Sequence, residues 1–347
     1  MGTFTSSPGS SFTISNDLLS QLLVGMRTEA VDNLFRKSAF LDAADKAGAI
    51  DRVSAASVWA EPLAVAEHSR ITQVSSGFEA LDMTISDVMN PAQYSWCGFH
   101  APILISRKEE LENSGEAQIV KILETRLSNV MGVLRREIEK QIVADASSIL
   151  TNMNSLYGGY SGAAVNNGFL YCDTTGTPGT VGGLARSTAL GLSNIVVSAT
   201  TATSVVEGLT QAWIKASDQA ARGEVGLILA GSTAFQLYKN ELFANEQYVN
   251  PSKLDGGTLA LSFHGAPVVF SSWMDTSKTT GGSATLDTAF YGINFDHIRL
   301  KIHPDADFAT GDFVDFPTQA VRGAKFDCLM QLTANHLGSS FAVVRAS

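Results

Sequence analysis

The most regular hydrophobic pattern of this chain lies between residues 106 and 153, where apolar side chains recur every three or four positions. Such spacing is typical of one face of a helix, and here it continues for about ten turns. At 1.5 Å per residue this helix would be about 55 to 60 Å long, which exceeds the width of a small domain. A coiled-coil arm or one helix of a bundle would also show such a stripe, but this pattern drifts from a strict heptad. We therefore expect an isolated helix that lies across a sheet or across neighbouring subunits.

Capping signals mark the start of this helical region. Ser106 and Glu109 have the spacing of a capping box, in which each residue satisfies a backbone N–H at a helix start. The run Asn113-Ser114-Gly115 then interrupts the pattern, and Ser114 can cap a second helix. The sequence thus predicts a short charged helical turn at residues 107–112 and a longer helix after it.

Strand patterns precede the helix at residues 58–65, 71–74 and 94–105. They are rich in aromatic and β-branched side chains, and Asn90-Pro91 between them is a turn signal. Together they predict a two-armed hairpin of about fifty residues. Because a lone hairpin is only marginally stable in water, we expect this one to gain stability from a partner surface.

The remaining chain alternates between loop-like composition and short periodic segments. Residues 16–40 predict one or two short amphipathic helices, and residues 157–183 have the Gly- and Thr-rich composition of loops. Ser204 with Glu207 is a second capping box. The elements expected after it are a helix ending at Arg222-Gly223, a strand at 225–230, a helix at 232–243, two strands at 259–273, further strand at 289–302 and two final strands within 325–344. This order predicts a compact α+β unit.

Composition narrows the classes of protein. Of the 347 residues, 45% are hydrophobic and 17% charged, which supplies a packed interior and excludes wholesale disorder. No apolar run reaches the roughly 18 residues of a membrane span, and the N-terminus lacks the pattern of a secretory signal. The net charge of −10 argues against binding nucleic acid through the whole surface. The three widely spaced cysteines indicate a reducing compartment.

Candidate chemistry is weak throughout the chain. Ser161 lies in Gly-Tyr-Ser-Gly-Ala, which misses the last glycine of a nucleophile elbow. The glycine-rich residues 176–183 lack the Lys-Ser/Thr ending of a phosphate-binding loop. His303, Asp305 and Asp307 form the nearest approach to a ligand cluster, and a solvated turn explains them equally well. We therefore expect no catalytic residue, metal or cofactor.

Taken together, the order of parts resembles the major capsid protein of tailed double-stranded DNA bacteriophages, the Hong Kong 97-like fold family. The local stretches that carry the resemblance are Val74–Glu79, Pro91–Trp96, Ala101–Ser106, Glu109–Gly115 and Phe290–Ile298. They are similar to the hairpin, helix start and late strand of such proteins. As an order of elements, the likeness covers nearly the whole chain.

The resemblance implies an α+β Hong Kong 97-like capsid fold and a domain layout. The expected parts are an N-terminal arm at 1–56, an extended hairpin (the E-loop) at 57–105, a peripheral domain at 106–200 with the spine helix at 106–153, an axial domain at 201–302 and returning strands at 303–347. Hexamers and pentamers would close into an icosahedral virion shell around DNA, assembled in the bacterial cytoplasm. Expected partners are further copies of the chain, a separate scaffolding protein, a portal and a decoration protein.

Two departures from relatives are visible in the residues. Some relatives weld the shell with a Lys–Asn isopeptide bond that uses an E-loop lysine, whereas residues 57–107 contain no lysine. We therefore expect no such cross-link there. Some relatives also carry a large N-terminal scaffold segment that is cleaved. Because only about fifty residues precede the hairpin here, we expect scaffolding to be a separate protein.

Contacts between subunits are expected on the hairpin and at the helix start, because Trp and Tyr are enriched at interfaces. The candidates are Trp59, Phe78, Glu79, Tyr94, Trp96, Phe99 and Arg107. Two alternatives stay open. An encapsulin shares the fold but encloses a cargo enzyme, and a soluble hydrolase would use Ser161 or the cluster at His303.

Overall fold

The structure is a computed structural model in which the chain forms two compact units. The described residues are 17, 19–26, 38–54, 57–64, 89–112, 116–143, 153–160, 163–164, 167–172, 179–186, 191–199, 204–219, 223–244, 252–253, 259–275, 286–316 and 320–345. Unit 1 comprises residues 1–34, 98–136 and 305–329, and unit 2 comprises residues 35–97, 137–304 and 330–347.

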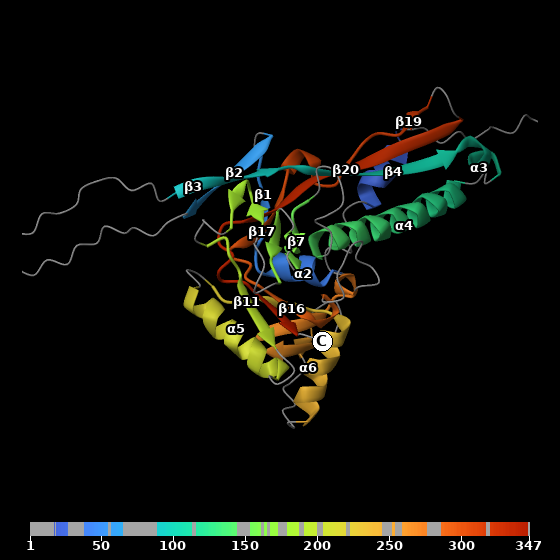
Figure 1. Ribbon diagram of the computed structural model, residues 1–347. Coiled ribbons are helices and arrows are strands. Elements are labelled where there is room, and N and C mark those ends of the chain that lie inside the picture. Colours follow the sequence, from blue (N-terminus) through green and yellow to red (C-terminus); the bar gives the residue numbers. More distant parts are fainter. Residues whose placement is uncertain are drawn as a thin grey trace, which may run out of the picture. The chain divides into compact units, whose positions relative to one another are not determined.

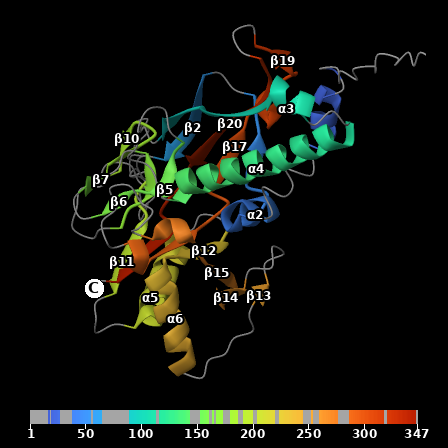
Figure 2. The same ribbon diagram turned by 90° about the vertical axis from the view of Figure 1, so that its right-hand side faces the viewer.

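The main core of unit 2 is a mixed seven-stranded sheet with the order β11-β21-β16-β12-β15-β14-β13. Two helices, α5 and α6, pack beside it in both views (Figures 1 and 2). Alternate side chains of the strands, such as Ile228, Phe290 and Val343, form one hydrophobic cluster with these helices. The elements are α5 (Val205–Gln219), α6 (Ser232–Ala244), β11 (Ile195–Ala199), β12 (Leu227–Ala230), β13 (Ser252–Lys253), β14 (Leu259–Phe263), β15 (Ala266–Phe270), β16 (Ala289–Ile293) and β21 (Phe341–Arg345).

These elements confirm most of the order expected for this region. Helix α5 ends at Gln219, a few residues before the predicted end at Arg222-Gly223, and residues 220–222 lie outside the described part. The turn between β14 and β15 is centred on His264 and Gly265, both with positive φ. The sequence pattern therefore located the helices, the turns and the buried strand β12 to within a few residues.

A second sheet of unit 2 contains β1 (Ile50–Arg52), β17 (Ile298–Ile302) and the C-terminal end of β20 (Val321–Ala334). Strand β1 pairs with β17 in parallel, and β17 pairs with β20 in antiparallel fashion, from Ile298 opposite Ala334 to Ile302 opposite Met330. Helix α2 (Ala39–Lys46) precedes β1, and Ser38 caps it by accepting a hydrogen bond from the Leu41 N–H.

Two chain segments, residues 294–297 and residues 335–340, connect the two sheets of unit 2. We call these two segments the seam. The chain leaves β16 for β17 through the first segment and leaves β20 for β21 through the second. The Asn335 N–H donates to the His297 carbonyl at 3.1 Å, and the Asn294 N–H donates to the Ser340 hydroxyl at 3.2 Å. The two returning strands expected at the C-terminus thus enter different sheets.

Unit 1 contains most of β4 (Cys97–Ser106), β18 (Ala309–Thr310), β19 (Val314–Asp315) and the N-terminal part of β20, which pairs with the other three. Its described helices include residues 19–26, α3 (Arg107–Glu112) and the first part of α4 (Glu116–Val143). Both α4 and β20 run from unit 1 into unit 2.

Helix α4 is shorter than the predicted spine helix. Its 28 residues correspond to about 42 Å, and Met153, the last residue of the predicted stripe, is not helical. Residues 144–152 lie outside the described part. The stripe is confirmed within the described part of the helix, because Leu123, Leu127, Met131, Leu134, Ile138 and Ile142 are all buried.

Small two-stranded ladders complete unit 2. One of them, β2 with β3, is the base of the predicted hairpin, and residues 65–88 between the strands lie outside the described part. The ladders are β2 (Val58–Ala64) with β3 (Met89–Ser95), β5 (Ser155–Tyr157) with β8 (Gly168–Leu170), β6 (Gly159–Tyr160) with β7 (Ala163–Ala164), and β9 (Thr180–Val181) with β10 (Leu184–Ala185). Short 3-10 helices are η1 (Ser272–Met274), η2 (Leu286–Thr288) and η3 (Pro304–Ala306). Within the described residues, no helix is long and apolar enough to cross a membrane.

Candidate functional site

The base of the hairpin is held to unit 2 by a buried lysine. Strand β2 pairs with β3 from Val58 opposite Ser95 to Ala64 opposite Met89. The Lys301 ammonium, on β17, forms an ion pair with Glu61 of β2 and lies 3.7 Å from the ring centroid of Trp59. The Trp59 indole N–H donates to the Glu61 carboxylate at 2.6 Å. Trp59, Glu61 and Lys301, which we call the hairpin clamp, therefore join an ion pair, a cation–π contact and a hydrogen bond.

Strand β3 is fixed to β20 by hydrogen bonds to its side chains and backbone. The Tyr94 hydroxyl donates to the Ala334 carbonyl at 2.8 Å, and burial raises the pKa of that hydroxyl. The Gln331 amide donates to the Ser95 carbonyl, and its oxygen accepts from the Asn154 N–H at 2.7 Å. These bonds pair buried polar groups, so moving the hairpin base would leave several of them unsatisfied.

The other side of β3 meets the turn between β9 and β10. The Gln93 N–H donates to the Gly182 carbonyl at 2.9 Å. Gly182 has φ +57°, and a Cβ there would lie 2.6 Å from the Cβ of Ala92, so only glycine fits. Directly after β10 the Arg186 guanidinium is buried, and that burial lowers its pKa to about 10. Within β3, Ala92 and Tyr94 are thus buried by their own subunit, whereas the other residues of the strand are exposed.

The strand run expected at residues 94–105 is broken at Trp96. Up to Ser95 it pairs with β2, and from Cys97 it continues as β4, which pairs with β20. The half-buried Trp96 ring lies edge-on to the His303 ring, with centroids 5.6 Å apart. Phe99 is buried within unit 1, on the inward-facing set of the alternating β4 residues.

The start of the helical region has the predicted cap. The Ser106 N–H donates to the Glu109 carboxylate at 3.1 Å, and the Ser106 hydroxyl accepts from the Lys108 N–H at 3.3 Å. The bond from the Ser106 N–H and the Arg126 guanidinium lower the pKa of Glu109. Arg126, on α4, also donates to the Leu104 carbonyl, which ties the corner between β4, α3 and α4 together. The Arg107 side chain is exposed.

The structure therefore distributes the predicted contact residues among different environments. Trp59, Tyr94 and Trp96 lie together at the hairpin base in unit 2, whereas Phe99 and Arg107 belong to unit 1. Phe78 and Glu79 lie outside the described residues. Whether these seven side chains touch a second subunit stays a prediction. Sequence reasoning missed Lys301, which lies with Arg299 in a short strand, Ile298–Ile302, where basic and apolar residues alternate.

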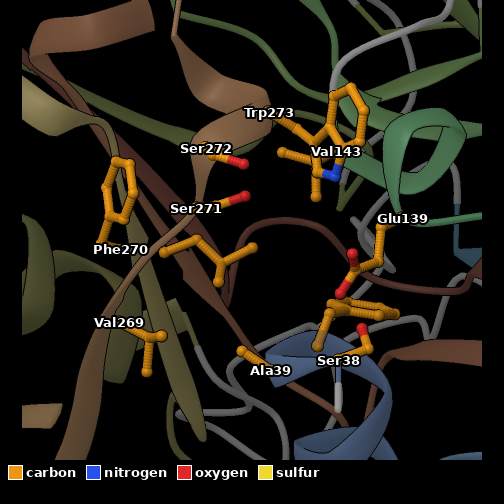
Figure 3. Close-up of a pocket in the computed structure, with 11 residues that line it drawn as sticks. Ser38, Ala39, Glu139, Val143, Val269, Phe270, Ser271, Ser272 and Trp273 are labelled. Atoms are coloured by element: carbon orange, nitrogen blue, oxygen red, sulfur yellow. The ribbon is translucent and has the colours of Figure 1, made fainter. Parts of the chain in front are cut away.

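A pocket of about 160 Å³ lies elsewhere in unit 2 (Figure 3). The start of α2, the end of α4 and the segment from β15 to η1 surround it. The carboxylate of Glu139 and the hydroxyls of Ser271 and Ser272 point into the same space, with the Trp273 indole close by. Its lining residues are Ser38, Ala39, Phe40, Glu139, Val143, Leu229, Val269, Phe270, Ser271, Ser272 and Trp273.

Candidates for catalysis are not assembled by the described residues. Ser161 lies outside the described part, and His303 packs on Trp96. Within the described ranges, no group of three or more His, Cys, Asp or Glu side chains could hold a metal ion. Cys97, Cys172 and Cys328 are buried free thiols.

Comparison with solved structures identifies the fold. The capsid asymmetric unit of cyanophage A-1(L) matches this chain with a TM-score of 0.56 at 14% identity, covering 83% of this chain and 87% of that chain. The expected α+β Hong Kong 97-like capsid fold is therefore confirmed. No protein-family model and no curated protein matched the sequence.

Two further solved structures are similar at lower scores. Mycobacterium phage Ogopogo matches at 14% identity with a TM-score of 0.49, over 90% of this chain and 91% of that chain. The holo-SrpI encapsulin complex of Synechococcus elongatus PCC 7942 matches at 13% identity with a TM-score of 0.47, over 85% and 84%.

Proposed function

We propose that this chain is a major capsid protein that assembles as hexamers and pentamers into an icosahedral phage head around double-stranded DNA. The observation that carries the proposal is the fold shared with the cyanophage A-1(L) capsid over most of both chains. The role is structural, and the chain acts through contacts with its own copies rather than through catalysis.

The hairpin clamp supports this role. Extended loops that contact neighbours need a fixed base, because binding is weakened when a segment must be ordered at the moment of contact. Here the clamp and the Tyr94 hydrogen bond hold both strands of the base. We assign residues 57–105 to the E-loop, 106–200 to the peripheral domain and 201–302 to the axial domain of the proposed shell protein.

The acidic composition is compatible with an enclosing role. With a net charge of −10 the chain does not attract DNA through its whole surface. A shell that surrounds DNA without sequence-specific binding needs no such attraction. We expect the mature location to be the virion, after assembly in the host cytoplasm with separate scaffolding, portal and decoration proteins.

Size-exclusion chromatography and electron microscopy of the purified chain test the proposal. We expect closed particles in the megadalton range, built from hexamers and pentamers. DNA in particles from infected cells would support a phage head, whereas a protein cargo would indicate an encapsulin instead. A chain that stays a folded 36.8 kDa monomer in every condition would contradict both.

A further inference from the structure

The pocket beside Glu139 has the chemistry of a cation site. Glu139 supplies a carboxylate, and Ser271 and Ser272 add hydroxyl oxygens that face the same space (Figure 3). Ser271 stands at the N-cap position of η1, yet its side chain makes no capping bond there. Among the described residues that line the pocket, none is basic.

The Glu139 carboxylate has no partner among the residues that the structure describes. No described residue donates a hydrogen bond to it or forms an ion pair with it, although the side chain is half-buried. A partly buried carboxylate without a donor is unfavourable, and a basic group that entered the pocket would form a charge-assisted hydrogen bond with it. An anion would instead be repelled by this charge.

The walls of the pocket suit a cation carried on an apolar stem. Val143, Leu229 and Val269 provide aliphatic surface, and the exposed Phe270 stands at the end of β15. The Trp273 indole is an aromatic face of the kind that attracts ammonium and guanidinium groups. Lysine and arginine side chains combine such a head with an aliphatic stem.

Size favours a single side chain as the occupant. A volume of about 160 Å³ is below the roughly 300 to 1,000 Å³ of pockets for cofactors and drug-sized ligands. It corresponds to roughly five water molecules in the liquid, at about 30 Å³ each. The pocket can therefore take the end of one long side chain.

A second copy of this chain can supply the complementary charge. The exposed side chain of Arg107 at the start of α3, and that of Lys121 on α4, form no ion pair with another described residue. An unpaired carboxylate in a pocket and unpaired surface cations on the same polypeptide are complementary when copies meet.

From these observations we propose that the Glu139 pocket receives a lysine or arginine side chain from a second copy of this chain. The inference rests on the proposed function, because it requires that copies assemble. It adds a specific contact that lies outside the hairpin.

Two variants that each remove one negative charge test this contact through their ability to assemble. The protein concentration at which particles form is measured by light scattering for the unaltered chain, for Glu139→Gln and for Glu137→Gln. Glu137 is exposed on the same helix, so its variant is the matched control for the loss of one negative charge. We expect the threshold to rise about fivefold or more for Glu139→Gln and to stay unchanged for Glu137→Gln.

A small free cation tests whether the group that fills the Glu139 pocket is a side chain of a second copy or a free amine from solution. Agmatine has a guanidinium head and an amine joined by a short alkyl chain, and KCl at the same ionic strength is the control. Agmatine should raise the assembly threshold of the unaltered chain and leave that of Glu139→Gln unaffected. If agmatine promotes assembly, a free amine fills the pocket and the proposed contact is wrong.

The outcomes separate this contact from the proposed function. Particles that form equally well from both variants would remove the contact and leave the shell role intact. An unaltered chain that forms no particles would remove both. Circular dichroism checks that Glu139→Gln folds, and if it does not, agmatine competition on the unaltered chain decides the question.

Discussion

At the scale of single residues, Lys301 carries the clearest energetic consequence. Its ammonium is buried between Glu61 and the Trp59 ring. Removing one partner of a buried ion pair leaves the other charge unpaired in a low-dielectric place, which costs about 3 to 5 kcal/mol. Because Glu61 keeps some exposure, we expect Lys301→Met to lower the free energy of unfolding by about 3 kcal/mol, as measured by urea denaturation before assembly.

A double variant is the control for this effect. Lys301→Met combined with Glu61→Gln removes both charges, so it should cost clearly less than the single substitution. If the single and double variants unfold at the same urea concentration, the clamp contributes no coupled ion pair.

His336 at the seam predicts a loss of stability in mild acid. The rings of His297 and His336 lie with centroids 5.1 Å apart, and burial followed by the His297 charge lowers the pKa of His336. His297 Nε2 and His336 Nδ1 are buried without a hydrogen-bond partner in the described structure. The carboxylate closest in sequence is that of Asp296, in the same turn as His297, and it is exposed.

The sign of the effect is set by proton binding. The unfolded chain takes up a proton on His336 near pH 6.5, before the folded chain does, so stability is full above that pH and falls as the pH drops below it. We expect the melting temperature to fall between pH 7.5 and 5.5, and to fall less in His336→Gln. Equal losses in both proteins would show that this histidine is not responsible.

Individual contacts were only partly predictable from the sequence. Tyr94 and Phe99 were selected as interface candidates for their residue type, and the structure shows both buried within the chain itself. Residue type does not reveal which face of a strand an aromatic occupies when both faces are covered. The Ser106–Glu109 cap was predictable, because its partners are three residues apart in sequence.

At the scale of elements, helix α5 depends on a carboxylate from another helix. Ser204 accepts a hydrogen bond from the Glu207 N–H at 3.0 Å, as its capping box predicted. Glu241, on α6, accepts from the Val205 and Val206 N–H groups at 2.9 and 3.0 Å. This carboxylate satisfies two of the orphan donors of the first turn and complements the helix dipole.

Glu241→Gln should therefore destabilise α5. The amide offers one acceptor oxygen and no charge, so we expect a loss of about 1 kcal/mol in urea denaturation. Glu207→Gln is the matched control, since that exposed carboxylate lies in the same first turn and accepts no bond from another described residue. A larger loss for Glu207→Gln would contradict the assigned role of Glu241.

Elements with strong local signals were predicted well, and elements defined by distant pairing were not. Helix α5 has its Ser204 cap and the β14–β15 hairpin its turn residues in their own sequence. The break at Trp96 has no such signal, because it arises where β3 leaves β2 and β4 meets β20. Helix α2 was missed beyond Phe40, since its eight residues carry too few turns to show a period.

At the scale of the whole molecule, burial is concentrated in the seven-stranded sheet of unit 2. All residues of β12 and β16 are buried, whereas those of β18 and β19 in unit 1 are half-buried or exposed. Amides in well-buried strands open only in large unfolding events. Hydrogen exchange of the unassembled chain should therefore be slower in β12 and β16 than in β18 and β19, on the order of 100-fold.

Comparable exchange rates in both sets of strands would mean that the two units unfold together.

The order of elements, and with it the capsid fold, was accessible from the sequence because it depends on the succession of patterns along the chain. The division of the final strands between two sheets was not, since the sheet that a strand joins depends on partners far away in the sequence.

The seam also bears on how foreign peptides could be displayed on this protein. Both connections between the sheets of unit 2 pass through it, so an insertion at residues 335–340 would disturb two crossings at once. The two-residue turn at His264 and Gly265 joins only neighbouring strands, and no atom would lie within 4 Å of a Cβ at Gly265, although its φ of +89° favours glycine at that position itself. A grafted epitope therefore belongs at that hairpin tip, where lengthening the loop costs little entropy.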